Sequence, residues 1–389
     1  MKLPQLEDLG PVEGKRVLVR CDFNVPLSNG EITDDLRIRL PIETLTWLLD
    51  HGAAKLTVCS HLGRPKGKPD PKYTIEPVRK RLNELLEERG ADTSRVELLE
   101  NLRYDAGEEG NLPELVASLV QGQDLYVDDA FGAVHRAHAS IVGPPQYLPS
   151  AAGRVLAREV EVLSGLLEEP ARPFVAVLGG AKVSDKLGVI DALLDKVDTL
   201  LVGGGMCFTF LAAQGYGTGG SLLEHDQVEK CAGLLESAAS RGKRILVPTD
   251  IIALSPGGVF GAGREPEGEM RQVGPEVPPE WIGLDIGPGT AGAFADEIAG
   301  AATVFWNGPM GVFEDPRFAA GTRAVAEAVA ATKAFTVVGG GDSASALKLF
   351  GLDDQVDHLS TGGGASLELI EKGDLPGLAA LREAAARQH

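Results

Sequence analysis

Short runs of apolar residues recur along the whole chain, without the regular alternation of apolar and polar positions seen in half-exposed strands. Such runs are typical of β-strands that are buried on both faces of a parallel sheet. Each run therefore predicts a strand. The runs lie at residues 16–26, 55–65, 96–103 and 124–132 in the first half, and at 174–180, 199–205, 244–250, 281–287, 302–308 and 335–341 in the second.

Patterns of helical period lie between many of these runs, for example at residues 77–90 and 318–332. Alternation of buried strands with amphipathic helices predicts an α/β protein. The chain has 389 residues, whereas a single hydrophobic core rarely grows beyond about 250–300 residues. We therefore predict two doubly wound, Rossmann-like domains with parallel sheets, joined by an interdomain helix and separated by an open cleft.

The predicted division between the domains lies near residue 150. Leucine and valine side chains recur at helical spacing between Ser150, a candidate N-cap, and Pro170, which ends the pattern. A last helical pattern near the C-terminus has no evident docking site, and the N-terminal domain is one possibility. We expect an N-terminal domain, a connecting helix, a C-terminal domain and a final helix, at residues 1–150, 151–170, 171–375 and 376–389.

The charge and the cysteines narrow the class of protein. The chain has 37 basic and 56 acidic residues and a net charge of −19, which argues against a protein that coats nucleic acid or an anionic membrane. Its four cysteines are far apart in the sequence, which argues against a zinc site or a disulfide framework. The first residues lack the apolar segment of a signal peptide, and no run of about 18 apolar residues occurs. We expect a soluble, cytoplasmic protein.

Charged and polar side chains gather where the predicted strands of the first half end. In an open α/β sheet ligands bind at this edge, and arginine binds phosphate or carboxylate through two parallel hydrogen bonds. Charged residues after a strand are also common on any surface, but here several strand ends carry them. We therefore favour a site for a small, multiply anionic substrate. The side chains are Asp22, Asn24, His61, Arg64, Arg103, Asp128, Asp129, His135 and Arg136.

Glycines follow the predicted strands of the second half, and glycine-rich turns offer backbone N–H groups to phosphates. The sequence has no Walker-type P-loop, but Gly-x-Gly-x-x-Gly occurs at residues 215–220 and 287–292. The second copy follows a predicted strand, yet it lacks the acidic residue expected about 20 positions later. A nicotinamide cofactor is therefore the weaker interpretation.

Three charged residues are candidates for nucleotide binding. Lys182 and Lys186 follow a glycine turn, and a helix would place both on one face, beside N–H groups that suit a polyphosphate. Two solvated lysines are the alternative. Asp342 follows the glycines at 339–341 and would be an N-cap or a Mg²⁺ ligand, of which the local sequence favours the N-cap.

Taken together, the motifs resemble one enzyme family, phosphoglycerate kinase, from near residue 16 to residue 377. The resemblance implies reversible phosphoryl transfer from 1,3-bisphosphoglycerate to ADP, giving 3-phosphoglycerate and ATP, with Mg²⁺ as cofactor. The segments that carry it are RCDFNVPL (20–27), ITDDLRI (32–38), SHLGRPKG (60–67), LLENLRYDAGEE (98–109), DAFGAVHRAHAS (129–140), LGGAKVSDKLGVI (178–190), LLVGGGMCFTFLAAQGYGTGGSLLE (200–224), DIGPGT (285–290), WNGPMGVFE (306–314), VVGGGDSASA (337–346) and LSTGGGASLELIEKGDLPG (359–377).

The resemblance also implies a role for particular residues. The N-terminal domain would bind the glycerate substrate, with Arg37 beside the transferring phosphoryl group. The residues implied for this substrate are Asp22, Asn24, Arg37, His61, Arg64, Arg103 and Arg136. The C-terminal domain would bind Mg-nucleotide, with Asp342 as the metal ligand and Glu314 at the ribose. The residues implied for the nucleotide are Lys186, Asn307, Glu314, Gly340, Gly341, Asp342 and Ser343.

The catalytic groups that the resemblance implies are Arg37, Lys182, Gly341 and Gly364. Lys182 would neutralise the migrating phosphoryl group, and Thr361 with residues 362–364 would begin a helix near it. A carboxylate is already ionised at neutral pH and needs no general base, so positioning and electrostatic stabilisation remain as the means of catalysis. Because the two substrates would bind to different domains, we expect the domains to close when both are bound.

Two positions depart from the family pattern, and neither removes an implied catalytic group. Asp128 stands where the family often has Asn, and Leu36 where Thr is frequent. A non-catalytic nucleotide-binding protein on the same fold is the alternative; loss of Arg37, Lys182, Lys186 or Asp342 would favour it, and all four are present. We expect small-molecule substrates, no nucleic-acid or membrane partner, and a monomer.

Overall fold

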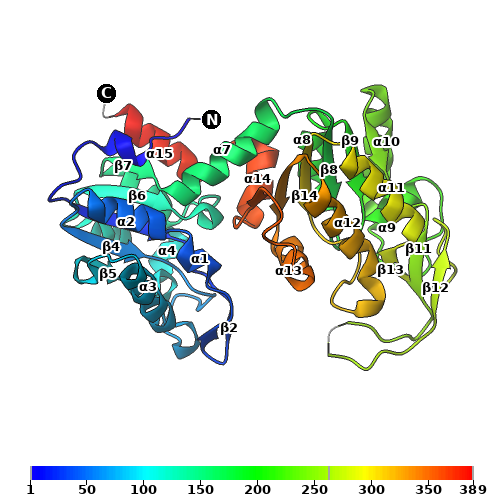
Figure 1. The fold of residues 1–389 in the computed structure, drawn as a ribbon, viewed down its shortest axis with the longest axis horizontal. Helices are drawn as coiled ribbons and strands as arrows, with labels where there is room; N and C mark the ends of the chain where they lie inside the picture. Colours follow the sequence, from blue (N-terminus) through cyan, green and yellow to red (C-terminus); the bar gives the residue numbers. More distant parts are fainter. Residues whose placement is uncertain (1, 262, 388–389) are drawn as a thin grey trace. The chain divides into compact units, whose positions relative to one another are not determined.

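The computed structural model describes residues 2–261 and 263–387. These residues form two compact units, called unit 1 and unit 2 below (Figure 1). Unit 1 contains the described residues up to Ser164 and from Lys372 onward, and unit 2 contains Gly165–Glu371. Each unit has a parallel sheet flanked by helices, which confirms the predicted α/β class with Rossmann-like units. No helix in the described ranges is long and apolar enough to cross a membrane.

The sheet of unit 1 has five parallel strands in the order β5-β4-β1-β6-β7. Its central strand is buried on both faces, as the unbroken apolar run predicts. Val17, Val19 and Cys21 pack with α2 (Ile42–Asp50) and α3 (Glu76–Glu88) in the main core. Arg20 points to the other face and donates to Ser140 on α6 (Ala139–Val142). The strands are β1 (Arg16–Cys21), β4 (Lys55–Cys59), β5 (Val96–Leu98), β6 (Leu125–Asp129) and β7 (Ser150–Ala152).

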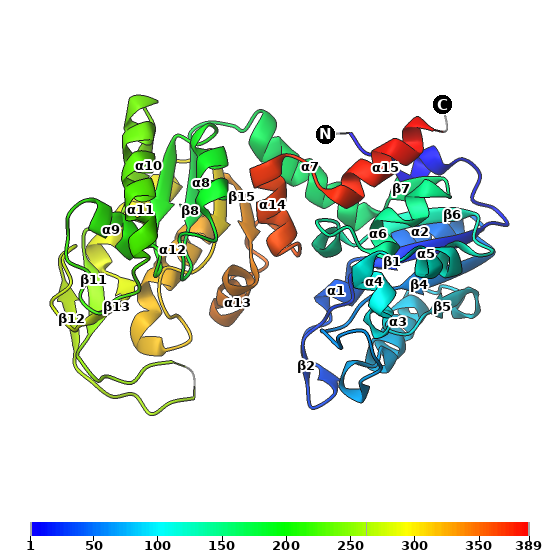
Figure 2. The same ribbon diagram turned by 180° about the vertical axis from the view of Figure 1, so that it is seen from behind.

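The sheet of unit 2 has six strands in the order β10-β9-β8-β14-β15-β16. Helices α11 (Pro288–Ala299), α12 (Ala320–Ala331) and α13 (Gly341–Phe350) cover one face and bury Trp306 of β14 completely. Figure 2 shows α8 (Leu187–Leu194) on the opposite face. The strands are β8 (Phe174–Leu178), β9 (Thr199–Val202), β10 (Arg244–Leu246), β14 (Thr303–Asn307), β15 (Phe335–Gly339) and β16 (His358–Leu359).

One predicted strand lies outside the parallel sheets. The run at 281–287 forms β13 (Ile282–Ile286), which pairs antiparallel with β11 (Ile251–Leu254) in a separate sheet of order β12-β11-β13. The placement predicted for it was wrong because an apolar run indicates burial but not the direction of the neighbouring strand. Strand β12 (Met270–Val273) and the hairpin of β2 (Leu27–Ser28) and β3 (Glu31–Ile32) are too short or too polar to be predicted from their pattern.

The helices fill the connections between the strands. In unit 1 they are α1 (Leu36–Arg39), α2 (Ile42–Asp50), α3 (Glu76–Glu88), α4 (Ala106–Gly110), α5 (Pro113–Val120), α6 (Ala139–Val142) and α15 (Pro376–Ala386), and α7 (Arg154–Glu168) crosses the boundary between the units. In unit 2 they are α8 (Leu187–Leu194), α9 (Cys207–Ala213), α10 (Val228–Ser240), α11 (Pro288–Ala299), α12 (Ala320–Ala331), α13 (Gly341–Phe350) and α14 (Gly364–Lys372).

Helix α7 begins later than the sequence indicates, and Ser150 is not its N-cap. Ser150 lies in β7, where it pairs with Tyr126. The N–H groups of Val155 and Leu156 instead donate to Asp129 Oδ1, at 2.8 and 3.1 Å. The cap therefore comes from the end of β6, far away in sequence, where a local pattern could not reveal it.

The final helix, α15, packs on unit 1 against α6 and β7 (Figures 1 and 2). Its Leu378 and Leu381 are fully buried. Gly377 donates to the carbonyl of Val134 at 2.9 Å, and a Cβ at this position would lie 2.7 Å from Ile141. The glycine thus permits the close approach of α15 to α6 in unit 1.

Candidate active site

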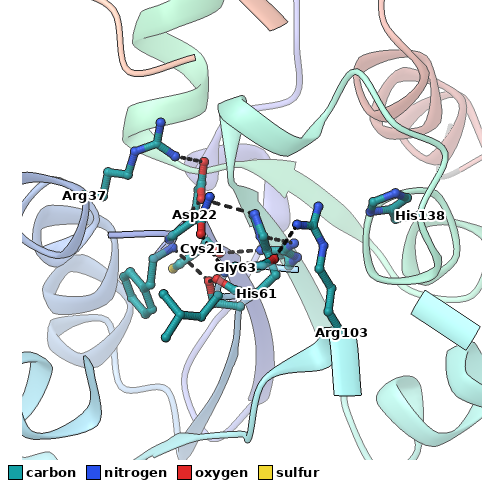
Figure 3. Close-up of polar contacts among 12 residues, drawn as sticks. Cys21, Asp22, Arg37, His61, Gly63, Arg103 and His138 are labelled. Atoms are coloured by element: carbon teal, nitrogen blue, oxygen red, sulfur yellow. Dashed lines mark hydrogen bonds and ion pairs between the residues drawn. The ribbon is translucent and has the colours of Figure 1, made fainter. Parts of the chain in front are cut away.

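The functional groups of unit 1 lie where its parallel strands end. Asp22 follows β1, His61 follows β4, and Arg103 follows β5 through the turn η4 (Leu102–Tyr104). Because these strands are neighbours in the sheet, their carboxyl ends bring the three side chains to one edge. Figure 3 shows Arg37 and Asp22 pointing toward one another, with His61 close by and Arg103 beyond it.

Arg37 comes from α1 and is paired with Asp22. Its Nη1 donates to Asp22 Oδ2 at 2.6 Å, and about 30% of the Arg37 side chain is exposed. Burial is the largest single effect and opposes ionisation of Asp22, but electrostatic interactions with Arg37, His61 and Arg20 together hold the pKa of Asp22 below its ordinary value. A Cβ on Gly132 would lie 2.3 Å from Asp22 Oδ2, so the close approach of this segment requires glycine.

Asn24 and Arg103 hold the loop that carries His61 and Arg64. Asn24 Oδ1 accepts from the N–H of Gly63 at 2.8 Å, and Arg103 Nη1 donates to the carbonyl of the same glycine, also at 2.8 Å. Asn101 Oδ1 accepts from Leu62, and the loop is thereby fixed from both sides. The Arg103 side chain is largely buried, which lowers its pKa.

The structure thus gathers Asp22, Arg37 and His61 directly and links Asn24 and Arg103 to them through Gly63. Arg64 and Arg136 have exposed side chains. Burial and, to a lesser extent, the charges of Arg103, Arg20 and Arg136 lower the pKa of the nearby His138 to about 4. Arg64, Arg103 and Arg136 thus follow β4, β5 and β6, whose carboxyl ends form one edge of the sheet.

Two carboxylates that the sequence placed at this edge, Asp128 and Asp129, are buried in the fold instead. Asp129 caps α7, as described above. Asp128 is fully buried, its Oδ1 accepts from the N–H of Ala130 at 3.0 Å, and burial raises its pKa to about 7. Both side chains point into unit 1 because they lie on β6, which is buried on both faces.

Unit 2 has a second cluster at the ends of β8, β14 and β15. Asn307 is the last residue of β14 and pairs with Gly339 on one side and Leu178 on the other. Lys186 Nζ donates to Asn307 Oδ1 and to its carbonyl oxygen. Burial lowers the pKa of Lys186 to about 8, although the charges of Asp342 and Asp185 oppose this shift.

The lysine motif does not lie on a helix. Helix α8 begins at Leu187, so Lys182 and Lys186 both belong to the loop after β8, and the predicted shared helix face was wrong. Gly180 in this loop has a φ of +112°, a conformation that interrupts regular structure. Lys182 is exposed and Lys186 is buried, so the two lysines have different surroundings.

The glycines at 339–341 form the start of α13. Gly340 is the N-cap, with a φ of +94°, and a Cβ there would lie 2.9 Å from Asn307 Nδ2. Asp342 is therefore not the N-cap; it lies in the first turn of α13 with an exposed side chain. Ser343 is buried and its Oγ accepts from the N–H of Gly308 at 2.7 Å.

A second glycine-rich helix start lies nearby in sequence. Gly364 is the first residue of α14, and a Cβ on Gly364 or Gly341 would meet nothing within 4 Å. Both helix starts are therefore open on the side of the missing side chain. Thr361 is half-buried at the beginning of this loop.

A pocket of about 440 Å³ lies in unit 2, and its lining includes Gly180 of the loop after β8 and Asp342 of α13. Phe208, Leu222 and Met310 supply apolar walls, and Glu314 and Asp342 are among its charged side chains. An apolar cavity with a few polar groups is typical of a small-molecule site. The sequence did not single out Phe208 or Leu222. In the structure Leu222 stands out because 57% of it is exposed, which is unusual for a leucine, but no sequence pattern indicated this.

The Gly-x-Gly-x-x-Gly motif at 287–292 begins α11, but its N-terminus is already occupied by a carboxylate. Asp250 accepts from the N–H groups of Gly289 and Thr290 at 2.9 and 2.7 Å, and from the Thr290 hydroxyl at 2.5 Å. The donors that a dinucleotide pyrophosphate would need are therefore taken. This removes the support for a nicotinamide cofactor.

Within the described ranges, no group of three or more His, Cys, Asp or Glu side chains is arranged to hold a metal ion. The exposed Asp342 carboxylate fits a metal that arrives with phosphates, because Mg²⁺ is commonly held by one or two carboxylates together with phosphate oxygens.

Comparisons with known proteins agree with this geometry. The family model described as "Phosphoglycerate kinase" matches residues 6–373. Proteins named phosphoglycerate kinase from Frankia casuarinae and Salinispora arenicola are each 53% identical to this chain; the matches cover 97% and 98% of this chain and 99% and 100% of those proteins. The solved structure of phosphoglycerate kinase from Coxiella burnetii is 38% identical, with a TM-score of 0.88 over 99% of this chain and 100% of that one. The chain belongs to the phosphoglycerate kinase family.

Proposed function

We propose that this chain catalyses reversible phosphoryl transfer from the acyl phosphate of 1,3-bisphosphoglycerate to ADP, which gives 3-phosphoglycerate and ATP. Membership of the family supports this activity. The main structural support is the set of cationic side chains at the sheet edge of unit 1, together with the open glycine-rich helix starts of unit 2. The reaction is a step of glycolysis, and we accordingly place the enzyme in the cytoplasm.

Unit 1 would bind the glycerate substrate. Arg64, Arg103 and Arg136 would bind the phosphate that does not react, because guanidinium groups suit phosphate oxygens. Asp22 and Asn24 would hold the glycerate backbone, either by accepting from its hydroxyl or by orienting the side chains beside it. The neutral His61 would donate a hydrogen bond to the glycerate. Arg37 would lie at the reacting end, held there by its hydrogen bond to Asp22.

Unit 2 would bind the nucleotide. The apolar pocket would take the base, Glu314 the ribose, and Lys186 with the start of α13 the phosphates. Gly340, Gly341 and Ser343 form that helix start, and Asn307 fixes Lys186. Lys182 and Gly364 would lie near the migrating phosphoryl group.

Asp342 would hold the Mg²⁺ ion that accompanies the nucleotide. That ion would neutralise charge on the phosphate oxygens and help to orient them. Asp342 would do this from an exposed position in the first turn of α13, close enough to Lys186 for its charge to raise the pKa of that lysine.

The chain's own residues would act by position and charge. The attacking carboxylate is ionised at neutral pH, so no side chain has to remove a proton. Arg37, Lys182 and the N–H groups of Gly341 and Gly364 would stabilise the negative charge that spreads over the oxygens of the transferring group. All of these groups belong to one chain, and we therefore propose that a monomer suffices for catalysis and that its partners are small molecules.

A coupled assay with ATP and 3-phosphoglycerate tests the proposal. We expect turnover that depends on both substrates and on Mg²⁺. Tight binding of nucleotide without turnover would instead favour the non-catalytic alternative. A parallel titration with NAD should show no binding at concentrations where ADP binds, because Asp250 occupies the N-terminus of α11.

A further inference from the structure

Behind the proposed glycerate site lies a buried polar network that takes no part in the roles assigned above. Arg20, Glu108 and Ser140 belong to β1, α4 and α6, and all three are 0% exposed. None of them can contact a ligand at the surface. Arg20 was not a candidate from the sequence, although a charged residue inside an apolar strand is a signal that could have found it.

Each nitrogen of the Arg20 guanidinium has a defined partner. Nε donates to Ser140 Oγ at 2.7 Å, Nη1 donates to the carbonyl of Cys21, and Nη2 lies 3.1 Å from His61 Nδ1. The charge is balanced by Glu108, whose Oε1 lies 3.8 Å from Nη2. The group is therefore held in a single orientation from three directions.

Glu108 is fixed by Ser140 in turn. Its Oε1 accepts from the Ser140 hydroxyl at 2.6 Å and its Oε2 from the Ser140 N–H at 3.0 Å. Because the hydroxyl proton is used toward Glu108, Ser140 Oγ has lone pairs left to accept from Arg20. The serine thus links the carboxylate to the guanidinium.

This arrangement determines where His61 carries its proton. A guanidinium has only donors, so Nδ1 of His61 must be the nitrogen without a proton. The proton then resides on Nε2, which points toward Asp22, whose Oδ1 lies 3.9 Å away. His61 can therefore donate from Nε2 at the site edge and cannot accept there.

The surroundings of His61 also keep it uncharged. Burial lowers the pKa of His61 well below its ordinary value, and the charges of Arg20, Arg103 and Arg37 lower it further, against the opposing effect of Asp22. Figure 3 shows His61 between Asp22 and Arg103.

We propose that Arg20 is a positioning residue, which holds His61 as the neutral tautomer with its proton on Nε2, and that Glu108 and Ser140 keep Arg20 in place. A buried ion pair contributes little to stability compared with apolar residues of similar volume, which is consistent with a role in orienting a side chain. The inference rests on the proposed function in one respect, namely that His61 donates to the glycerate substrate.

Nuclear magnetic resonance of enzyme labelled with ¹⁵N-histidine tests the tautomer directly. Long-range ¹H–¹⁵N spectra distinguish protonated from unprotonated ring nitrogens, and the variant His61→Gln identifies the His61 signals. We expect the wild-type enzyme at neutral pH to show His61 with a proton on Nε2 alone. A proton on Nδ1, or a doubly protonated ring, overturns the proposal whatever the enzyme's activity.

Arg20→Met should convert the His61 signals to an average of the two tautomers. The KM for 3-phosphoglycerate should rise about 10-fold, as expected for loss of a charge-assisted hydrogen bond, while the KM for ATP and kcat change much less. The double variant Arg20→Met/Glu108→Gln removes both buried charges and guards against a folding failure caused by an unpaired Glu108. Ser140→Ala is the milder variant, because it loosens Arg20 without removing a charge.

Tyr126→Phe is the matched control. Its hydroxyl donates to the carbonyl of Ser140 at 2.7 Å and is equally buried, but within the described residues no hydrogen bond joins it to Arg20 or His61. It should leave the tautomer and the KM for 3-phosphoglycerate unchanged. A folded Arg20 variant with the wild-type spectrum and KM would refute the positioning role. Absence of kinase turnover in the wild-type enzyme would refute the proposed function instead and leave the spectrum as an independent result.

Discussion

Arg37 combines a fixed position with partial exposure, since Asp22 holds one side of its guanidinium and about 30% of the side chain remains exposed. We expect Arg37→Ala to lower kcat by about 10²–10³-fold, because a preorganised charge acts mainly where negative charge develops in the transition state. Steady-state kinetics with both substrates measure this. If kcat stays unchanged and only the KM for 3-phosphoglycerate rises, Arg37 acts in substrate binding alone.

Lys186 should make nucleotide binding sensitive to pH. Burial lowers its pKa to about 8, so the free protein loses this positive charge as the pH rises through 8, and the affinity for ATP should fall over the same range. Isothermal titration calorimetry on either side of pH 8 measures the effect. Lys186→Met is the control, because it should bind ATP weakly at every pH without a step near 8.

Asp128 should make the fold less stable as the pH rises. Burial raises its pKa to about 7 from an ordinary value of 3.8, so between these values the folded chain holds a proton that the unfolded chain has released. The contribution of Asp128 to the free energy of unfolding is therefore greatest below about pH 4 and declines up to about pH 7.

Asp128→Asn tests this dependence with a side chain of the same shape. Within the described residues, Asp128 Oδ2 is buried without a hydrogen-bond partner, and an amide in its place carries no charge to bury. Urea denaturation should give a shallower decline of stability between pH 4 and pH 7 in the variant than in the wild type. Parallel pH profiles would show that Asp128 titrates normally in the folded chain.

Two kinds of helix start in the described chain differ in whether they can bind an anion. Helices α7 and α11 are capped by carboxylates, Asp129 at the end of β6 and Asp250 just before β11, so the first N–H groups of these helices have acceptors within the fold. The N-cap of α13 is Gly340, which has no side chain to accept from the first turn. A capped start excludes an anion, whereas a glycine start leaves the donors for a phosphate. This distinction explains why only some of the glycine motifs are proposed to bind nucleotide.

Asp250→Ala should destabilise α11. The substitution removes the acceptor for Gly289 and Thr290, and an N-cap contributes about 1–2 kcal/mol to the free energy of unfolding. Hydrogen exchange of the first amides of α11, together with urea denaturation, measures the loss. Asp250→Asn keeps an acceptor oxygen and should cost less. Equal losses in the two variants would indicate that the charge matters rather than the cap.

In the proposed function the two substrates would bind to different units, and the reaction requires contact between them. Reacting atoms must come within about 3–3.5 Å with water excluded. We therefore expect small-angle X-ray scattering to give a smaller radius of gyration with both substrates bound than with either alone. A non-reacting ATP analogue with 3-phosphoglycerate provides the doubly bound state. Identical profiles for free and doubly bound enzyme would argue against closure and would leave the kinase activity unaffected.

The α/β class and most strands of the two sheets could be predicted from the sequence, because a strand buried on both faces must be apolar along its whole length. The runs beginning near Arg16, Lys55 and Phe174 accordingly became β1, β4 and β8. The resemblance to the family implied Arg37, and the glycine turn before the two lysines pointed to Lys186, because both signals lie in local sequence. Contacts between residues far apart in the sequence leave no such local pattern.

Tertiary packing settled the features that depend on such partners. Asp129 caps a helix that begins about two dozen residues later, and Asp250 caps one nearly forty residues away, so no local pattern could reveal either. The run at 281–287 took an antiparallel neighbour, which burial alone does not specify. Arg20 reached Ser140 and Glu108 only because β1 lies beneath α4 and α6. The apolar pattern of a segment indicates whether its residues are buried. Which residues they contact depends on the path of the folded chain.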